Sequence, residues 1–74
     1  MRILINAPMA RDKIIALLCE YNENGVQFGL IKSEGIRLEF EASNIEGDAA
    51  VGLVKKLIRE TDFGKVLYFS VNAL

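Results

Sequence analysis

Two glutamates, Glu39 and Glu41, come closest to a pair of side chains that could do chemistry together. Paired carboxylates can act as general acid and base or can bind a hard cation. They lie in the stretch IRLEFEAS, residues 36–43, where apolar and polar side chains alternate as in a strand with one buried face. Both carboxylates then share the solvent face with Arg37, where a raised pKa is difficult to arrange. We therefore expect a solvated charged ladder rather than a catalytic or metal-binding pair.

The other reactive side chain is Cys19, the single cysteine of a chain that has no histidine. Its expected position near the C-terminal end of a helix disfavours the thiolate, so we expect it to be packed or partly buried. Without histidine, a Ser–His–Asp triad or a Cys–His pair cannot be built, and a lone cysteine without histidine disfavours a structural zinc site. The sequence thus predicts a protein that is not an enzyme, with no catalytic, cofactor-binding or metal-binding residue and no cofactor.

Two short motifs indicate structure rather than chemistry. The DFG triplet, residues 62–64, matches the magnesium-binding triplet of protein kinases, but that signature also needs a catalytic loop and a glycine-rich loop. We expect a helix-to-strand turn there, with Phe63 tucked beneath it. The stretch NIEGDAAVG, residues 44–52, could begin a helix that holds an anion, but Glu46 and Asp48 would oppose it.

The composition is that of one small folded domain, residues 1–74, with 51% hydrophobic and 26% charged residues. A core of this size contributes about 3–5 kcal/mol of net stability, and one cysteine allows no internal disulfide, which leaves self-association as a source of further stability. The net charge of −1 gives no general attraction to nucleic acid or to an anionic membrane. No stretch resembles a signal peptide or a membrane span, and with the unpaired Cys19 this predicts a cytoplasmic protein.

The hydrophobic pattern predicts four strands and two helices. The strands are expected at residues 2–6, 26–32, 36–43 and 65–74, and the helices at residues 8–21 and 49–60. Pro8 suits the first turn of a helix capped by Asn6, and Gly25 suits the left-handed position that follows a helix. Ser43 and Glu46 have the spacing of a capping box, with Asn44 and Asp48 as rival caps.

The element order β-α-β-β-α-β is that of the split βαβ arrangement. With right-handed crossovers it predicts an α+β ferredoxin-like sandwich, a four-stranded antiparallel sheet with both helices on one face. The residues expected to point inward are Ile3, Ile5, Val26, Phe28, Leu30, Ile36, Leu38, Phe40, Leu67, Phe69 and Val71. The outward face carries Leu4, Glu39 and Glu41 on the two central strands, which disfavours the aromatic and basic platform with which such sheets bind RNA.

The final strand is the feature that favours a partner. The stretch VLYFSV, residues 66–71, is apolar and uncharged, and in this topology it lies at a sheet edge guarded only by Lys65. The residues predicted to make the interaction are Leu4, Val66, Tyr68 and Ser70. We expect a homodimer, formed by edge pairing or by an outward patch of Leu4, Val66 and Tyr68. The alternatives are an adaptor or regulatory subunit that binds a different protein, and a domain that senses a small metabolite, for which no pocket residue is evident.

Overall fold

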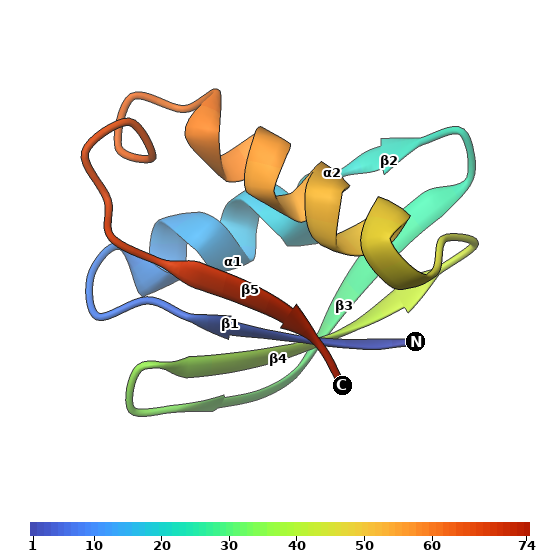
Figure 1. Ribbon diagram of the computed structural model, residues 1–74, viewed down its shortest axis with the longest axis horizontal. Coiled ribbons are helices and arrows are strands. Elements are labelled where there is room, and N and C mark those ends of the chain that lie inside the picture. Colours follow the sequence, from blue (N-terminus) through green and yellow to red (C-terminus); the bar gives the residue numbers. More distant parts are fainter.

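A five-stranded antiparallel sheet and two helices are formed by residues Met1–Leu74, all of which the computed structural model describes (Figure 1). The elements are β1 (Arg2–Asn6), α1 (Arg11–Glu20), β2 (Asn22–Glu23), β3 (Val26–Glu34), β4 (Arg37–Ser43), α2 (Gly47–Arg59) and β5 (Ser70–Ala73). The strand order is β2-β3-β4-β1-β5, and every neighbouring pair is antiparallel. Both helices lie on one face of the sheet, so the predicted α+β class is confirmed.

One hydrophobic core lies between the helices and the sheet. Alternate residues of β1 and β4 point into it, with Ile3, Ile5, Leu38 and Phe40 fully buried. The helices contribute Ile14 and Leu18 from α1 and Ala50, Val54 and Ile58 from α2, at the helical spacing that the sequence shows. No helix of the chain is both long enough and apolar enough to span a membrane.

The fifth strand, β2, was not predicted. Asn24 and Gly25 both have positive φ, 56° and 76°, which makes a tight turn that folds Asn22 and Glu23 back onto the start of β3. Gly25 therefore belongs to this turn and does not follow a helix, because α1 already ends at Glu20. The side-chain amide of Asn44 donates a 2.7 Å hydrogen bond to the Gly25 carbonyl and holds the turn against the end of β4.

The helices begin at other residues than predicted, α1 later, at Arg11, and α2 slightly earlier, at Gly47. Asn6 is the last residue of β1, paired with Arg37 on one side and Ser70 on the other, so it is unable to cap a helix. Pro8 lies in the bend that follows, and α1 begins at Arg11 after Ala10 in the left-handed conformation. The predicted capping box is also wrong, because Ser43 remains in β4 and α2 begins at Gly47 without a side-chain cap.

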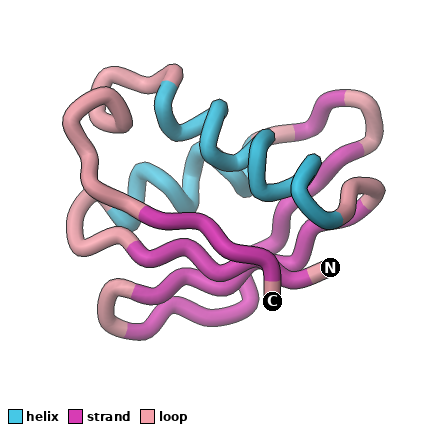
Figure 2. The backbone as a smooth tube through the Cα atoms, viewed as in Figure 1, coloured by secondary structure: helices cyan, strands magenta, loops and turns pink.

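The last strand is much shorter than the predicted residues 65–74. Only Ser70–Ala73 pair with β1, and the chain before them is a connection from the end of α2 (Figure 2). Phe63, Leu67 and Phe69 pack half-buried against the core from this connection. The apolar spacing that suggested a strand therefore arises from loop side chains that cover the core, and the inward positions predicted for Leu67 and Phe69 are only partly reached.

Two residues predicted to be inward lie at the surface. Leu30 is 39% exposed and Ile36 is 50% exposed. The register of β3 shifts between Leu30 and Lys32, which is a bulge, and the hairpin from there to β4 has only exposed residues. The buried positions of β3 end at Phe28, and the bulge that follows Leu30 takes the rest of the strand off its regular alternation.

Candidate interaction surface

The four residues predicted to make an interaction lie in two places. Leu4 is half-buried on the outer face of β1, between Asn72 of β5 and Glu39 of β4. Ser70 begins β5 on the same face, where its hydroxyl accepts a 3.4 Å hydrogen bond from the Asn6 side chain. Leu4 thus has polar neighbours on both sides.

Val66 and Tyr68 lie instead on the connection between α2 and β5, which is not part of the sheet. They are the two most exposed large hydrophobic residues of the chain, at 90% and 86%. Val66 lines a hollow beside α1, whereas Tyr68 lines a neighbouring hollow beside Arg59 and Lys65. Val66 and Tyr68 therefore lie outside the sheet that holds Leu4. Tyr68 lies two residues before Ser70, where β5 begins.

The outer edge of β5 has no neighbouring strand. The Leu74 amide donates a 2.9 Å hydrogen bond to the Arg2 carbonyl, so the backbone N–H of Leu74 points towards β1. Residues of an antiparallel strand direct their backbone groups alternately to the two sides. The backbone N–H and C=O groups of Asn72 and Ser70 therefore also point towards β1. Those of Val71 and Ala73 point outward to solvent. The strand carries no charged side chain.

An apolar hollow of about 500 Å³ opens between the start of α1 and the connection that follows α2. Its lining, by which we define the apolar hollow, is Met9, Ala10, Lys13, Phe63, Val66 and Leu67. Met9 is 71% exposed at its margin. Met9 and Lys13 were not among the residues predicted from the sequence. The one sequence feature that marks Met9 is that it is apolar and follows Pro8, without the helical spacing that relates Ile14 and Leu18.

Three cations surround the apolar hollow and its neighbour. The Lys13 ammonium lies 5.7 Å from the centre of the Phe63 ring, and the Arg59 guanidinium lies 5.9 Å from that of Phe69. Lys65 lines the neighbouring hollow with Arg59. None of the three forms an ion pair, because the two ion pairs of the chain involve the Met1 amine and Lys32. No acidic residue lines either hollow.

The connection is held in place by a tight turn at the end of α2. The Thr61 hydroxyl donates a 2.5 Å hydrogen bond to the Ile58 carbonyl and accepts a 2.9 Å bond from the Gly64 amide. Gly64 is buried so closely against Ile58 that a side chain there would overlap with its carbonyl group. The DFG triplet thus forms the expected turn, and Phe63 is half-buried in the wall of the apolar hollow.

The two glutamates that could have formed a chemical pair have separate surroundings. Glu39 lines a small hollow of about 100 Å³ with Lys32, Glu34 and Arg37 on the β3–β4 hairpin, where the Lys32 ammonium lies 3.1 Å from a Glu34 carboxylate oxygen. Glu41 instead lies 2.8 Å from the Met1 amine. Nowhere does the structure bring together three or more cysteine, aspartate or glutamate side chains that could hold a metal ion.

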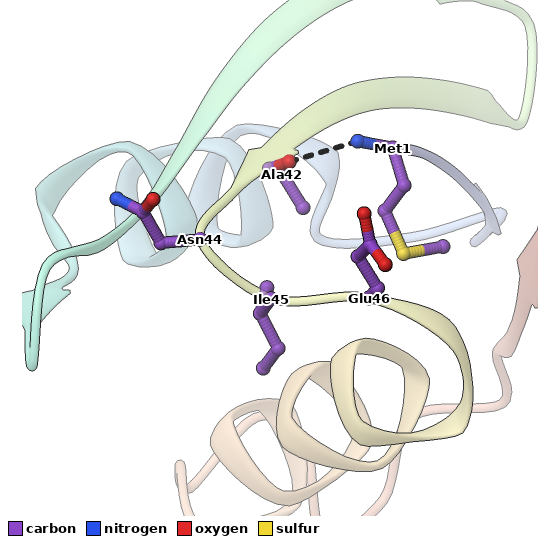
Figure 3. Close-up of a pocket in the computed structure, with 5 residues that line it drawn as sticks. All are labelled: Met1, Ala42, Asn44, Ile45 and Glu46. Atoms are coloured by element: carbon purple, nitrogen blue, oxygen red, sulfur yellow. Dashed lines mark hydrogen bonds between the residues drawn. The ribbon is translucent and has the colours of Figure 1, made fainter.

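The Met1 amine is fixed at the edge of a fourth hollow, lined by Met1, Ala42, Asn44, Ile45 and Glu46 (Figure 3). The amine donates a 3.0 Å hydrogen bond to the Ala42 carbonyl and pairs with Glu41. The hydrogen bond from the amine holds the pKa of the Glu41 carboxyl below its usual value, and the positive charges of the amine and Arg2 act in the same direction. These contacts tie the first residue of the chain to the end of β4.

Cys19 is exposed on α1, so the expectation that it would be packed or partly buried is wrong. The buried stripe of α1 passes through Ile14 and Leu18, and Cys19 follows one position later on the solvent side.

Comparisons with models of known families, with curated proteins and with solved structures found no match to the chain.

Proposed function

We propose that this chain is a non-enzymatic protein-interaction domain that forms a homodimer by pairing β5 of one copy with β5 of another. The proposed fold is the ferredoxin-like split βαβ sandwich with β2 as an added strand. The order β3-β4-β1-β5, without β2, supports it, because it is the order of four strands that this topology requires. A reducing compartment such as the cytoplasm suits the exposed thiol of Cys19.

The free edge of β5 is the observation that carries the homodimer. Val71 and Ala73 each offer an unpaired N–H and C=O, which is a template for another strand. A two-fold axis at Asn72 places Val71 opposite Ala73 of the second copy, and each such pair exchanges two hydrogen bonds. No like charges meet across this seam, because β5 is uncharged.

Side chains beside the edge would add apolar contact to this pairing. In the same register Ser70 lies opposite Leu74 of the second copy, and Leu74 is 60% exposed in the single chain. Tyr68, two positions before Ser70, is a diagonal neighbour of that leucine. Two of the four residues predicted from the sequence, Tyr68 and Ser70, therefore belong to the proposed interface.

The proposed interface is small, so we expect the affinity of the dimer to be low. A standard interface covers about 800 Å² of each partner, whereas this chain has a total accessible surface of 4568 Å² and a four-residue edge strand. We therefore expect association in the micromolar range or weaker, measurable by sedimentation equilibrium between about 1 μM and about 1 mM.

Substitution of the outward-facing Ala73 separates edge pairing from other modes of association. Ala73→Pro removes one outward N–H and leaves the hydrogen bonds to β1 intact, as proline is tolerated on a free edge. It is expected to be a folded monomer, whereas the control Ala73→Val keeps the N–H and is expected to dimerise. Tyr68→Lys is expected to weaken the dimer less than Ala73→Pro. A wild-type chain that stays monomeric at the highest concentration, or an Ala73→Pro variant that dimerises normally, would show the proposal to be wrong.

The second candidate is an adaptor whose β5 edge takes a strand from a different protein. The same free backbone groups favour it, since they do not discriminate between a copy and another chain. Affinity capture from the native cell with wild-type chain and with Ala73→Pro distinguishes the two. A partner that is captured by the first and lost with the second, from a chain that is monomeric alone, indicates the adaptor.

A further inference from the structure

We propose that the apolar hollow binds an acidic amphipathic segment of a partner protein, with one apolar side chain in the hollow and carboxylates beside Lys13 and Lys65. This site is separate from the β5 edge. It is formed by the start of α1 and by the connection after α2, both of which lie at the end of the molecule where β1 leaves the sheet (Figure 1).

The hollow has the size and chemistry to receive a side chain. Five of its six lining residues are apolar, and its volume of about 500 Å³ falls in the range of ligand pockets. Val66 and Met9 stand exposed at its margin, 90% and 71%, so a segment that lies across the hollow would cover both. The other hollows of the chain are lined by more polar surfaces, with charged residues in the wall.

The charges around the hollow select an acidic partner. Lys13 lies in its wall, and Arg59 and Lys65 lie in the neighbouring hollow that shares Leu67 with it. All three lack an ion-pair partner within the chain. The nearest acidic residues in the sequence, Asp12, Glu60 and Asp62, line neither hollow. An acidic segment therefore finds three free cations and no carboxylate facing it.

The same charges disfavour two other occupants of the apolar hollow, a second copy of the chain and an anionic membrane. A second copy that docked by a two-fold axis would place the three cations of one copy against those of the other. An anionic membrane would attract these cations, but the chain as a whole has a net charge of −1. A concave site also suits one inserted side chain better than it suits a flat bilayer surface.

Two matched synthetic peptides test this proposal. One is a helix-forming peptide with leucine at every third or fourth position and glutamate elsewhere, and the other has lysine in place of each glutamate. Fluorescence anisotropy is expected to show that the glutamate peptide binds about tenfold or more tightly than the lysine peptide, and that added salt weakens it. Amide shifts in NMR spectra are expected at Met9, Lys13 and Val66.

Variants of the chain identify the site. Lys13→Glu and Val66→Ser change exposed side chains and should leave the fold intact, yet each is expected to weaken the glutamate peptide about tenfold. The control Lys32→Glu makes the same charge change on β3 and should leave the affinity unchanged, as should the Ala73→Pro monomer. The proposal is overturned if both peptides bind equally, if Lys13→Glu has no effect, if the shifts map elsewhere, or if phosphatidylserine vesicles bind the hollow and the glutamate peptide does not.

Discussion

Replacement of Gly64 by alanine is expected to destabilise the protein strongly, although it adds one methyl group. Gly64 packs against the end of α2, and an added Cβ would overlap with the Ile58 carbonyl oxygen and lie 2.7 Å from the Thr61 hydroxyl oxygen. Neither neighbour can yield easily, since one belongs to the backbone of a helix and the other is fixed by two hydrogen bonds. The turn itself must therefore open.

The cost follows from these contacts. Backbone shifts that relieve overpacking cost about 1–3 kcal/mol, and each of the two Thr61 hydrogen bonds contributes about 0.5–1.5 kcal/mol. We expect a loss of about 2–6 kcal/mol in the free energy of unfolding. A core of this size contributes only about 3–5 kcal/mol in total, so the Gly64→Ala variant should be close to unfolded at room temperature.

Urea unfolding followed by far-UV circular dichroism measures this loss. The matched control is Gly52→Ala, which makes the same change in the exposed interior of α2, where a Cβ would meet nothing within 4 Å. It should raise the free energy of unfolding by about 0.5–1 kcal/mol, because alanine favours the helix. A Gly64→Ala variant as stable as the wild type would refute the reasoning, since it would mean that the turn does not lie against Ile58.

Two further predictions concern the end of β4. Asn44→Ala removes the hydrogen bond to the Gly25 carbonyl and leaves alanine at a φ of 64°, so it should lower the free energy of unfolding, measured in urea, by about 1–2 kcal/mol. Glycine tolerates that φ, so the control Asn44→Gly should lose less stability. An Asn44→Ala variant as stable as the wild type would contradict the role of the bond. Acetylation of the Met1 amine should raise the lowered pKa of Glu41 towards its usual value in an NMR titration. Because that pKa is lowered in the folded state, the ion pair stabilises the fold above the usual carboxyl pKa and is lost as the pH falls through the lowered value. A Glu41 pKa that does not change on acetylation would count against the contact.

The periodic segments of the sequence predicted the core well. In β1 and β4 the alternating residues are fully buried at Ile3, Ile5, Leu38 and Phe40, and in α2 the residues buried at helical spacing are Ala50, Val54 and Ile58, because these elements lie against the core. The sequence failed where side chains cover the core without regular structure. Leu67 and Phe69 have strand-like spacing, but the turn at Gly64 carries the chain across the end of the molecule before β5 begins.

The candidate surfaces were predicted only in part. Val66 and Tyr68 were predicted as outward apolar residues of a final edge strand, whereas they lie in the connection before β5, where they are the most exposed large hydrophobic residues. Their neighbours could not be predicted, because Met9 and Lys13 lie more than fifty positions before Val66 and share its hollow only through the packing of the start of α1 against the connection after α2. The turn at Asn24 and Gly25 was not predicted, because Gly25 was expected to follow directly on a helix that in the structure already ends at Glu20.

The two edges of the sheet differ, and the difference limits how far copies of the chain could assemble. β2 covers the start of β3, and beyond it the bulge after Leu30 and the charges of Lys32 and Glu34 leave an edge that is a poor template for another strand. In the proposed dimer, pairing at β5 uses the uncharged edge of both copies and leaves free only the opposite edge, formed by the two residues of β2 and by the rest of β3. If copies pair through β5 as proposed, growth stops at two chains rather than continuing into a filament, because the remaining edge is short, bulged and charged.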